Sequence, residues 1–231
     1  MTATALRPIE AGEEILNYYG ALSNGELLRR YGYTTPTHRR YDIVELSWAL
    51  VLTSLKQELA LSSEEMDRIV SYLHPLAPLC VSCLTRTKTQ NLDPDELEDS
   101  FVLDRNLDEA DSTGQVSDND SFRGLPEELE EQVKGFLKVV RKLKPHAIPD
   151  KRKRDEVYLH VVRSAINARL SEYPTTLDDD RALVAKSSGR LRAAIEVRLG
   201  EKVLLHAARD FVTAELEEAG TSEPAPKRRR A

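Results

Sequence analysis

Apolar residues recur with helical spacing through most of the chain from residue 43 onward. They lie three and four positions apart over 43–60 and again over 66–73, which predicts two helices. Ser62 and Glu65 have the spacing of a capping box at the start of the second helix. The same periodicity predicts further helices over 125–143, 151–172, 177–187 and 190–218. The pattern therefore indicates a mainly α fold.

The N-terminal part of the chain has a different pattern. Residues 1–20 are typical of a strand–turn–strand unit, with Ala11-Gly12 as the turn. Ser23 and Glu26 then form a second capping box, and Gly32 is expected to end the helix that they begin. Three tyrosines surround this short helix: Tyr19, Tyr31 and Tyr33.

Composition divides the chain further. Residues 91–121 are strongly acidic and rich in Asn, Ser and Gly, which predicts a long flexible loop, and Phe101-Val102-Leu103 is a candidate strand within it. We therefore expect three parts: a β-containing segment over 1–40, a helical domain over 41–219 and a disordered basic tail over 220–231.

Charge and composition exclude several classes of protein. The net charge of −6 argues against a protein that binds nucleic acid over its whole surface. No apolar run approaches the roughly 20 residues that span a bilayer, so we expect no membrane segment. The first residues lack the apolar core of a secretory signal, and two cysteines cannot form a disulfide framework. We expect an intracellular protein.

The two cysteines leave two interpretations. Cys80 and Cys83, with His74 six residues before them, have the spacing of half a zinc site. A tetrahedral site needs further ligands, and the other histidines are scattered along the chain. We expect incidental or structural cysteines and no bound metal.

The tyrosines also leave two interpretations when they are taken alone. A strand with two tyrosines and a helix with one more is usually a matter of packing. A tyrosine hydroxyl can also orient an amine, and its ordinary pKa near 10 allows it to handle a proton beside a positive charge.

The order of residues in two blocks resembles a known enzyme family. The first block, over residues 7–33, contains Ala11-Gly12-Glu13-Glu14-Ile15 and ends in Tyr31-Gly32-Tyr33. The second, over residues 173–205, begins with Tyr173-Pro174-Thr175-Thr176. They resemble the end of the SET domain and the helical substrate-binding domain of SET-domain protein-lysine methyltransferases, in the Rubisco large-subunit methyltransferase-like group and nearest to its nuclear members.

The resemblance implies a chemistry and a set of roles. Tyr19 matches the family's catalytic tyrosine, Tyr31 the tyrosine that borders both cofactor and target lysine, and Tyr33 an aromatic position near the cofactor. The implied cofactor is S-adenosyl-L-methionine. The implied partner is a protein substrate, ribosomal or otherwise basic and nuclear, with no direct contact to nucleic acid. Neither the resemblance nor the residues indicate an oligomeric state.

The chain departs from the family in one respect. The family's Gly-x-Gly-type cofactor segment and its Asn-His motif precede the tyrosine block, and neither motif occurs in the 231 residues. We therefore expect a fragment of a methyltransferase that binds the cofactor poorly and is weak or inactive by itself. The alternative is a non-catalytic helical interaction module derived from such an enzyme.

Two basic clusters and one glycine give further predictions. Lys227-Arg228-Arg229-Arg230 resembles a nuclear-import signal, which predicts a nuclear protein, although a solvated tail is the alternative. The cluster over 151–154 lies at a predicted helix N-terminus, where positive charge is mildly unfavourable, so we expect a solvated face. Gly200 is expected to weaken the last helix by ~1 kcal/mol relative to alanine.

Overall fold

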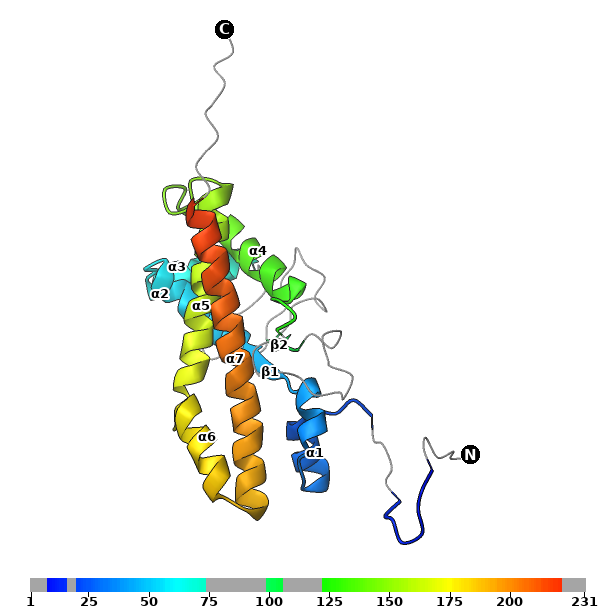
Figure 1. Ribbon diagram of the computed structural model, residues 1–231. Helices are drawn as coiled ribbons and strands as arrows, with labels where there is room; N and C mark the ends of the chain where they lie inside the picture. The colour runs from blue at the N-terminus through cyan, green and yellow to red at the C-terminus, as the bar shows by residue number, and fades with distance from the viewer. Residues whose placement is uncertain (1–7, 16–19, 74–98, 106–121, 222–231) are drawn as a thin grey trace.

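Two long helices lie side by side in opposite directions in the computed structural model (Figure 1), which describes residues 8–15, 20–73, 99–105 and 122–221. They are α5 (Lys151–Ser171) and α7 (Gly189–Thr221), and α6 (Leu177–Lys186) connects them at one end. The start of α5 therefore lies beside the end of α7, as a hydrogen bond between Arg152 and Ala219 also shows.

Three further helices pack around one half of this pair. Helix α2 (Trp48–Glu58) packs on α5, and α3 (Ser63–Leu73) packs on α4 (Glu127–Leu143), which also contacts α5. Their apolar stripes meet the inner faces of α5 and α7 in one core. Its largest fully buried apolar side chains include Phe136, Leu46, Leu55, Leu103, Leu129, Leu137, Ile148, Ile166 and Leu204. The mainly helical fold class is confirmed.

A two-stranded antiparallel sheet lies at the edge of this core. Strand β1 (Val44–Ser47) pairs with β2 (Ser100–Leu103), and Leu46 stands opposite Phe101. The predicted strand at Phe101-Val102-Leu103 is confirmed. It falls within the segment that was expected to be a loop, most of which lies outside the described residues.

The expectation of one helix over 43–60 is wrong at its start. Val44 and Leu46 are buried whereas Glu45 between them is exposed, so this stretch alternates as a strand does. Ser47 then caps α2 by accepting a hydrogen bond from the backbone N–H of Leu50. The strand is too short for its period to stand out from the helical pattern that follows it.

Of the two predicted capping boxes, the one at Ser62 forms completely and the one at Ser23 only in part. Ser62 and Glu65 bond each other's backbone N–H groups, as the capping box requires. Helix α1 (Asn24–Tyr31) begins at Ser23, whose Oγ accepts from the N–H of Glu26, and ends at Gly32 with φ of 80°. The Glu26 carboxylate itself turns toward Arg29 and Arg30. A 3₁₀ helix, η1 (Pro36–Tyr41), leads from α1 to the sheet.

The predicted strands of the N-terminal segment are not supported where the structure describes it. Residues 8–15 contain the turn at Ala11-Gly12, with Gly12 at φ of 88°, and no strand. An isolated strand is not stable, and both described strands pair only with each other. Tyr19, the cysteine pair and the basic tail lie outside the described residues. None of the described helices is both long and apolar enough to cross a bilayer.

Candidate functional site

Two of the three candidate tyrosines come together at the end of α1. The ring centres of Tyr31 and Tyr33 lie 6.4 Å apart, with 38° between the ring planes. Both side chains are partly exposed, at 43% and 40%. Tyr19 falls outside the described residues, so its place relative to this pair remains a prediction.

Helix α1 lies beside the N-terminal half of α7 (Figure 1). Its one fully buried apolar side chain is Leu27. Asn24 is also buried, and its side-chain Oδ1 accepts a hydrogen bond from the backbone N–H of Thr35 at 2.9 Å. The Oγ1 of Thr34 donates to Oε2 of Glu196 on α7 at 2.7 Å. Asn24 thus has a structural role at the start of α1.

Asp42 and Gly200 form the closest approach between these elements. Asp42 is 4% exposed, and its Oδ1 accepts a hydrogen bond from the backbone N–H of Asn24 at 3.0 Å. A Cβ added to Gly200 would overlap Oδ2 of Asp42 and lie 3.2 Å from its Cγ. Gly200 therefore has a role besides the expected weakening of α7, because the absence of its side chain makes room for Asp42.

Burial changes the acidity of Asp42. It raises the pKa of this carboxyl from 3.8 to about 6, against the lowering effects of the Asn24 N–H and of the charges on Arg105 and Arg39. Its Oδ2 is buried without a hydrogen-bond partner among the described residues. Asp42 is the junction of three elements, since it ends η1, precedes β1 and touches both α1 and α7.

A second polar cluster joins α6 to α7. Asp180 on α6 is fully buried, and Lys202 on α7 is 1% exposed. Lys202 Nζ donates to Asp180 Oδ2 at 2.6 Å, and Arg198 Nε donates to the same oxygen at 2.9 Å. Thr175 Oγ1 donates to Asp180 Oδ1 at 2.7 Å. Burial acts to raise the pKa of Asp180, but the hydrogen bonds from Arg198, Lys202 and Thr175 hold it below its ordinary value.

This cluster is a structural one. Lys202 Nζ also donates to the carbonyl oxygens of Thr175 and Thr176, so the ammonium group is surrounded by acceptors. The Tyr173 hydroxyl donates to Glu201 at 2.5 Å beside it. These polar groups bond one another, and they join residues 173–180 to residues 198–202 within the second sequence block. The spacing of Arg198 and Lys202, one helical turn apart, was the available signal.

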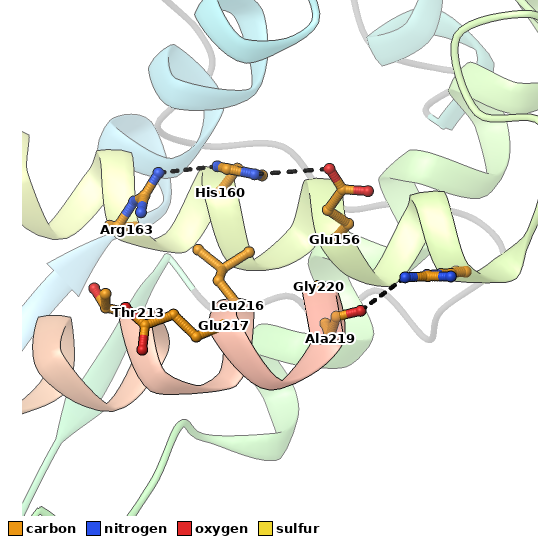
Figure 2. Close-up of a pocket in the computed structure, with 9 residues that line it drawn as sticks. Glu156, His160, Arg163, Thr213, Leu216, Glu217, Ala219 and Gly220 are labelled. Carbon is orange, nitrogen blue, oxygen red and sulfur yellow. Dashed lines mark hydrogen bonds and ion pairs between the residues drawn. The ribbon is translucent and has the colours of Figure 1, made fainter. Parts of the chain in front are cut away.

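A pocket of about 340 Å³ lies between the start of α5 and the end of α7 (Figure 2). His160 stands at its wall, with Arg163 Nη2 3.1 Å from its Nδ1 and Glu156 Oε1 3.9 Å from its Nε2. Leu216 on α7 is about 24 Å along the helix from Gly200, at 1.5 Å per residue. The pocket is therefore separate from the tyrosine helix.

The basic cluster over 151–154 is not simply a solvated face. Arg152 donates to the carbonyl oxygen of Ala219 at 2.9 Å, near the C-terminal end of α7. Positive charge is favourable at that end of a helix. Lys153 pairs with Glu156 one turn along α5. In the described part of the chain no three His, Cys, Asp or Glu side chains gather as metal ligands would.

Comparison with known families gives this arrangement a name. A family model described as Rubisco LSMT substrate-binding matches residues 81–205, more than half of the chain. The chain belongs to this family. The matched range of this substrate-binding domain includes Asp180, Lys202 and Gly200, and the resemblance that the sequence indicated is confirmed.

One curated relative extends the comparison beyond that domain's name. The chain is similar to ribosomal lysine N-methyltransferase 4 of Saccharomyces cerevisiae, with 39% identity over 69 residues. The similar region is 30% of this chain and 14% of the relative. The comparisons thus point to a protein of the lysine methyltransferase type. The roles of Tyr19, Tyr31 and Tyr33 stay predictions.

Proposed function

We propose that this chain supplies the last segment of a SET domain and the attached substrate-binding domain for methylation of protein lysine. One observation supports this most. Helix α1, which carries Tyr31 at its end, is anchored through Asn24 and Thr34 to the neighbourhood of α7. The part of α7 that it meets lies within the matched substrate-binding domain, which ends at residue 205. If the tyrosine segment is fixed on that domain, its tyrosines would keep a constant position relative to the lysine of a bound substrate.

The chain's own residues suit the implied cofactor. S-adenosyl-L-methionine supplies a sulfonium methyl group when it is bound. The rings of Tyr31 and Tyr33 are close together and partly exposed, and aromatic faces attract cations such as a sulfonium or a lysine ammonium. The lysine must give up its proton, which burial in a narrow channel and a neighbouring positive charge both favour. The Tyr19 hydroxyl would then orient the amine lone pair.

We propose a basic protein, ribosomal or nuclear, as the substrate class. The net charge of −6 favours a basic partner. The relative that the chain resembles is named for methylation of ribosomal protein lysine, which is consistent with this class. S-adenosylmethionine-dependent labelling of a ribosomal protein fraction is the direct assay, and labelling confined to acidic proteins would contradict it.

The 231-residue chain alone is expected to bind the cofactor weakly. Neither the Gly-x-Gly nor the Asn-His motif occurs in it, so two contact regions of the implied site are missing. Isothermal titration of S-adenosylmethionine into the purified chain should give a dissociation constant weaker than micromolar. Micromolar binding would show that the present residues suffice, against this account.

A non-catalytic interaction module is the second candidate. The observation in its favour is that α2, α4, α5 and α7 share one core without any contribution from the tyrosine helix. A module would bind its protein partner and leave no methyl group on it. Mass spectrometry of the bound partner after incubation with S-adenosylmethionine separates the two candidates, because only the methyltransferase adds mass to lysine.

We propose a nuclear address in the tail. Residues 220–231, fused to a fluorescent reporter, should concentrate it in the nucleus, because Lys227-Arg228-Arg229-Arg230 has the composition of an import signal. The matched control replaces these four residues by alanine and should leave the reporter evenly spread. An even distribution of the unaltered fusion would contradict the proposal.

A further inference from the structure

The tyrosine helix needs an anchor from elsewhere in the chain. Helix α1 has eight residues, and isolated helices of that length are not stable in water. Its first N–H groups have no partner within the helix. Ser23 satisfies that of Glu26, and Asp42 satisfies that of Asn24 from eighteen positions away in sequence.

Asp42 also reaches past α1 to α7. Its Oδ2 occupies the space that a Cβ on Gly200 would take, so any side chain at position 200 would push the carboxylate away. The other glycine at this contact is less demanding. A Cβ on Gly25 would lie 3.7 Å from Val197 Cγ1, which is an ordinary contact distance. The absence of a side chain at position 200 therefore determines whether the Asp42 carboxylate can contact α1 and α7 at the same time.

We propose that Asp42 is the positioning residue that fixes the tyrosine-bearing helix α1 on the substrate-binding helix α7, and that Gly200 is required to admit it. The inference rests on the proposed function in one respect: only if the protein methylates lysine does the placement of Tyr31 and Tyr33 matter for activity. The contact itself can be tested without methyl transfer. Asp42 acts through α1 and touches no substrate.

The charged groups around Asp42 give the contact a pH dependence. Arg39 on η1 and Arg105 beyond β2 face the carboxyl, and Glu196 is the nearby acid on α7 that bonds Thr34. The pKa of Asp42 is raised to about 6, from 3.8 when it is exposed. Because the pKa is higher in the folded chain, the pH-dependent part of the stability that Asp42 contributes is fully present below pH 3.8 and is lost as the pH rises through about 6. The hydrogen bond to the Asn24 N–H is the part that does not depend on this titration. Holding the carboxyl neutral should tighten the contact.

Hydrogen–deuterium exchange of the purified chain tests the proposal. Asp42→Ala should raise exchange in α1 about tenfold, the equivalent of one lost hydrogen bond to a charged group. Gly200→Ala should do the same by displacing the carboxylate. Asp42→Asn keeps an acceptor for the Asn24 N–H and should preserve protection in α1, but without the change between pH 4 and 6. Gly135→Ala, on α4 where an added Cβ meets nothing within 4 Å, is the matched control and should leave α1 unchanged.

Two results would overturn the proposal. One is unchanged protection of α1 in Asp42→Ala. The other is an equal loss of protection in α1, α5 and α7, which would make Asp42 a residue of general stability. A failure to detect methyl transfer would count against the proposed function alone, since exchange in α1 is measured without a cofactor.

Discussion

Asp180→Asn is expected to lower the free energy of unfolding by about 3 kcal/mol or more, because it leaves the buried ammonium of Lys202 without its charge partner. Both side chains are almost completely shielded from water. The substitution replaces one carboxylate oxygen by an NH2 group, so it removes the negative charge while the side chain keeps nearly the same shape. The loss would therefore measure the charge pairing and not a cavity. Chemical denaturation followed by circular dichroism gives the value.

The matched control lies on the same helix. Asp178 pairs with Arg181, but its side chain is 89% exposed, so Asp178→Asn should change stability by less than about 1 kcal/mol. The pKa of Asp180 is held below its ordinary value, so its contribution is present above about pH 4 and is lost as the pH falls further. Asp180→Asn should therefore lose most stability at neutral pH. Equal losses for the two variants would contradict the role of the buried pair.

Most helices could be predicted from the sequence because their signals are local. The expected helix over 125–143 corresponds to α4, and the one over 190–218 to α7, within a few residues at each end. An apolar stripe and a cap lie within the segment that they define. Strand β1 was missed because its partner β2 lies more than fifty residues away, and its two buried residues are too few to show a period.

The contacts that position the candidate site could not be predicted from the sequence, because they join residues far apart along the chain. Asp42 reads as one more acid and Gly200 as a flaw in a helix, and only the folded chain brings them together. The same is true of Arg152, whose partner is the carbonyl of Ala219. The motif resemblance, by contrast, pointed to Tyr31 and Tyr33 one by one, and the structure places their rings 6.4 Å apart. The sequence could therefore suggest candidate residues, whereas the contacts that hold their helix in place are visible only in the folded chain.

The largest expected effect on activity belongs to Tyr19. If its hydroxyl orients the lysine nitrogen and stabilises charge in the transition state, Tyr19→Phe removes one aligned hydrogen-bonding group. Loss of such a group lowers turnover on the order of a hundredfold or more. The substrate should still bind, because the matched family is described as a substrate-binding domain and Tyr19 lies outside the matched residues. The change should therefore appear in kcat and much less in KM.

Tyr158 provides the matched control. Its hydroxyl is buried on α5 without a hydrogen-bond partner among the described residues, and burial raises its pKa. Tyr158→Phe removes a hydroxyl of the same kind and leaves no partner unpaired, so the fold and the turnover should both be kept. The two variants thus separate a role in chemistry from the loss of any tyrosine hydroxyl.

Methyl transfer from labelled S-adenosylmethionine to protein lysine, measured with a form of the protein that carries a complete SET domain, tests the central claim most directly. The account predicts activity in the unaltered protein, about a hundredfold lower turnover in Tyr19→Phe and unchanged turnover in Tyr158→Phe. Full turnover in Tyr19→Phe would contradict it.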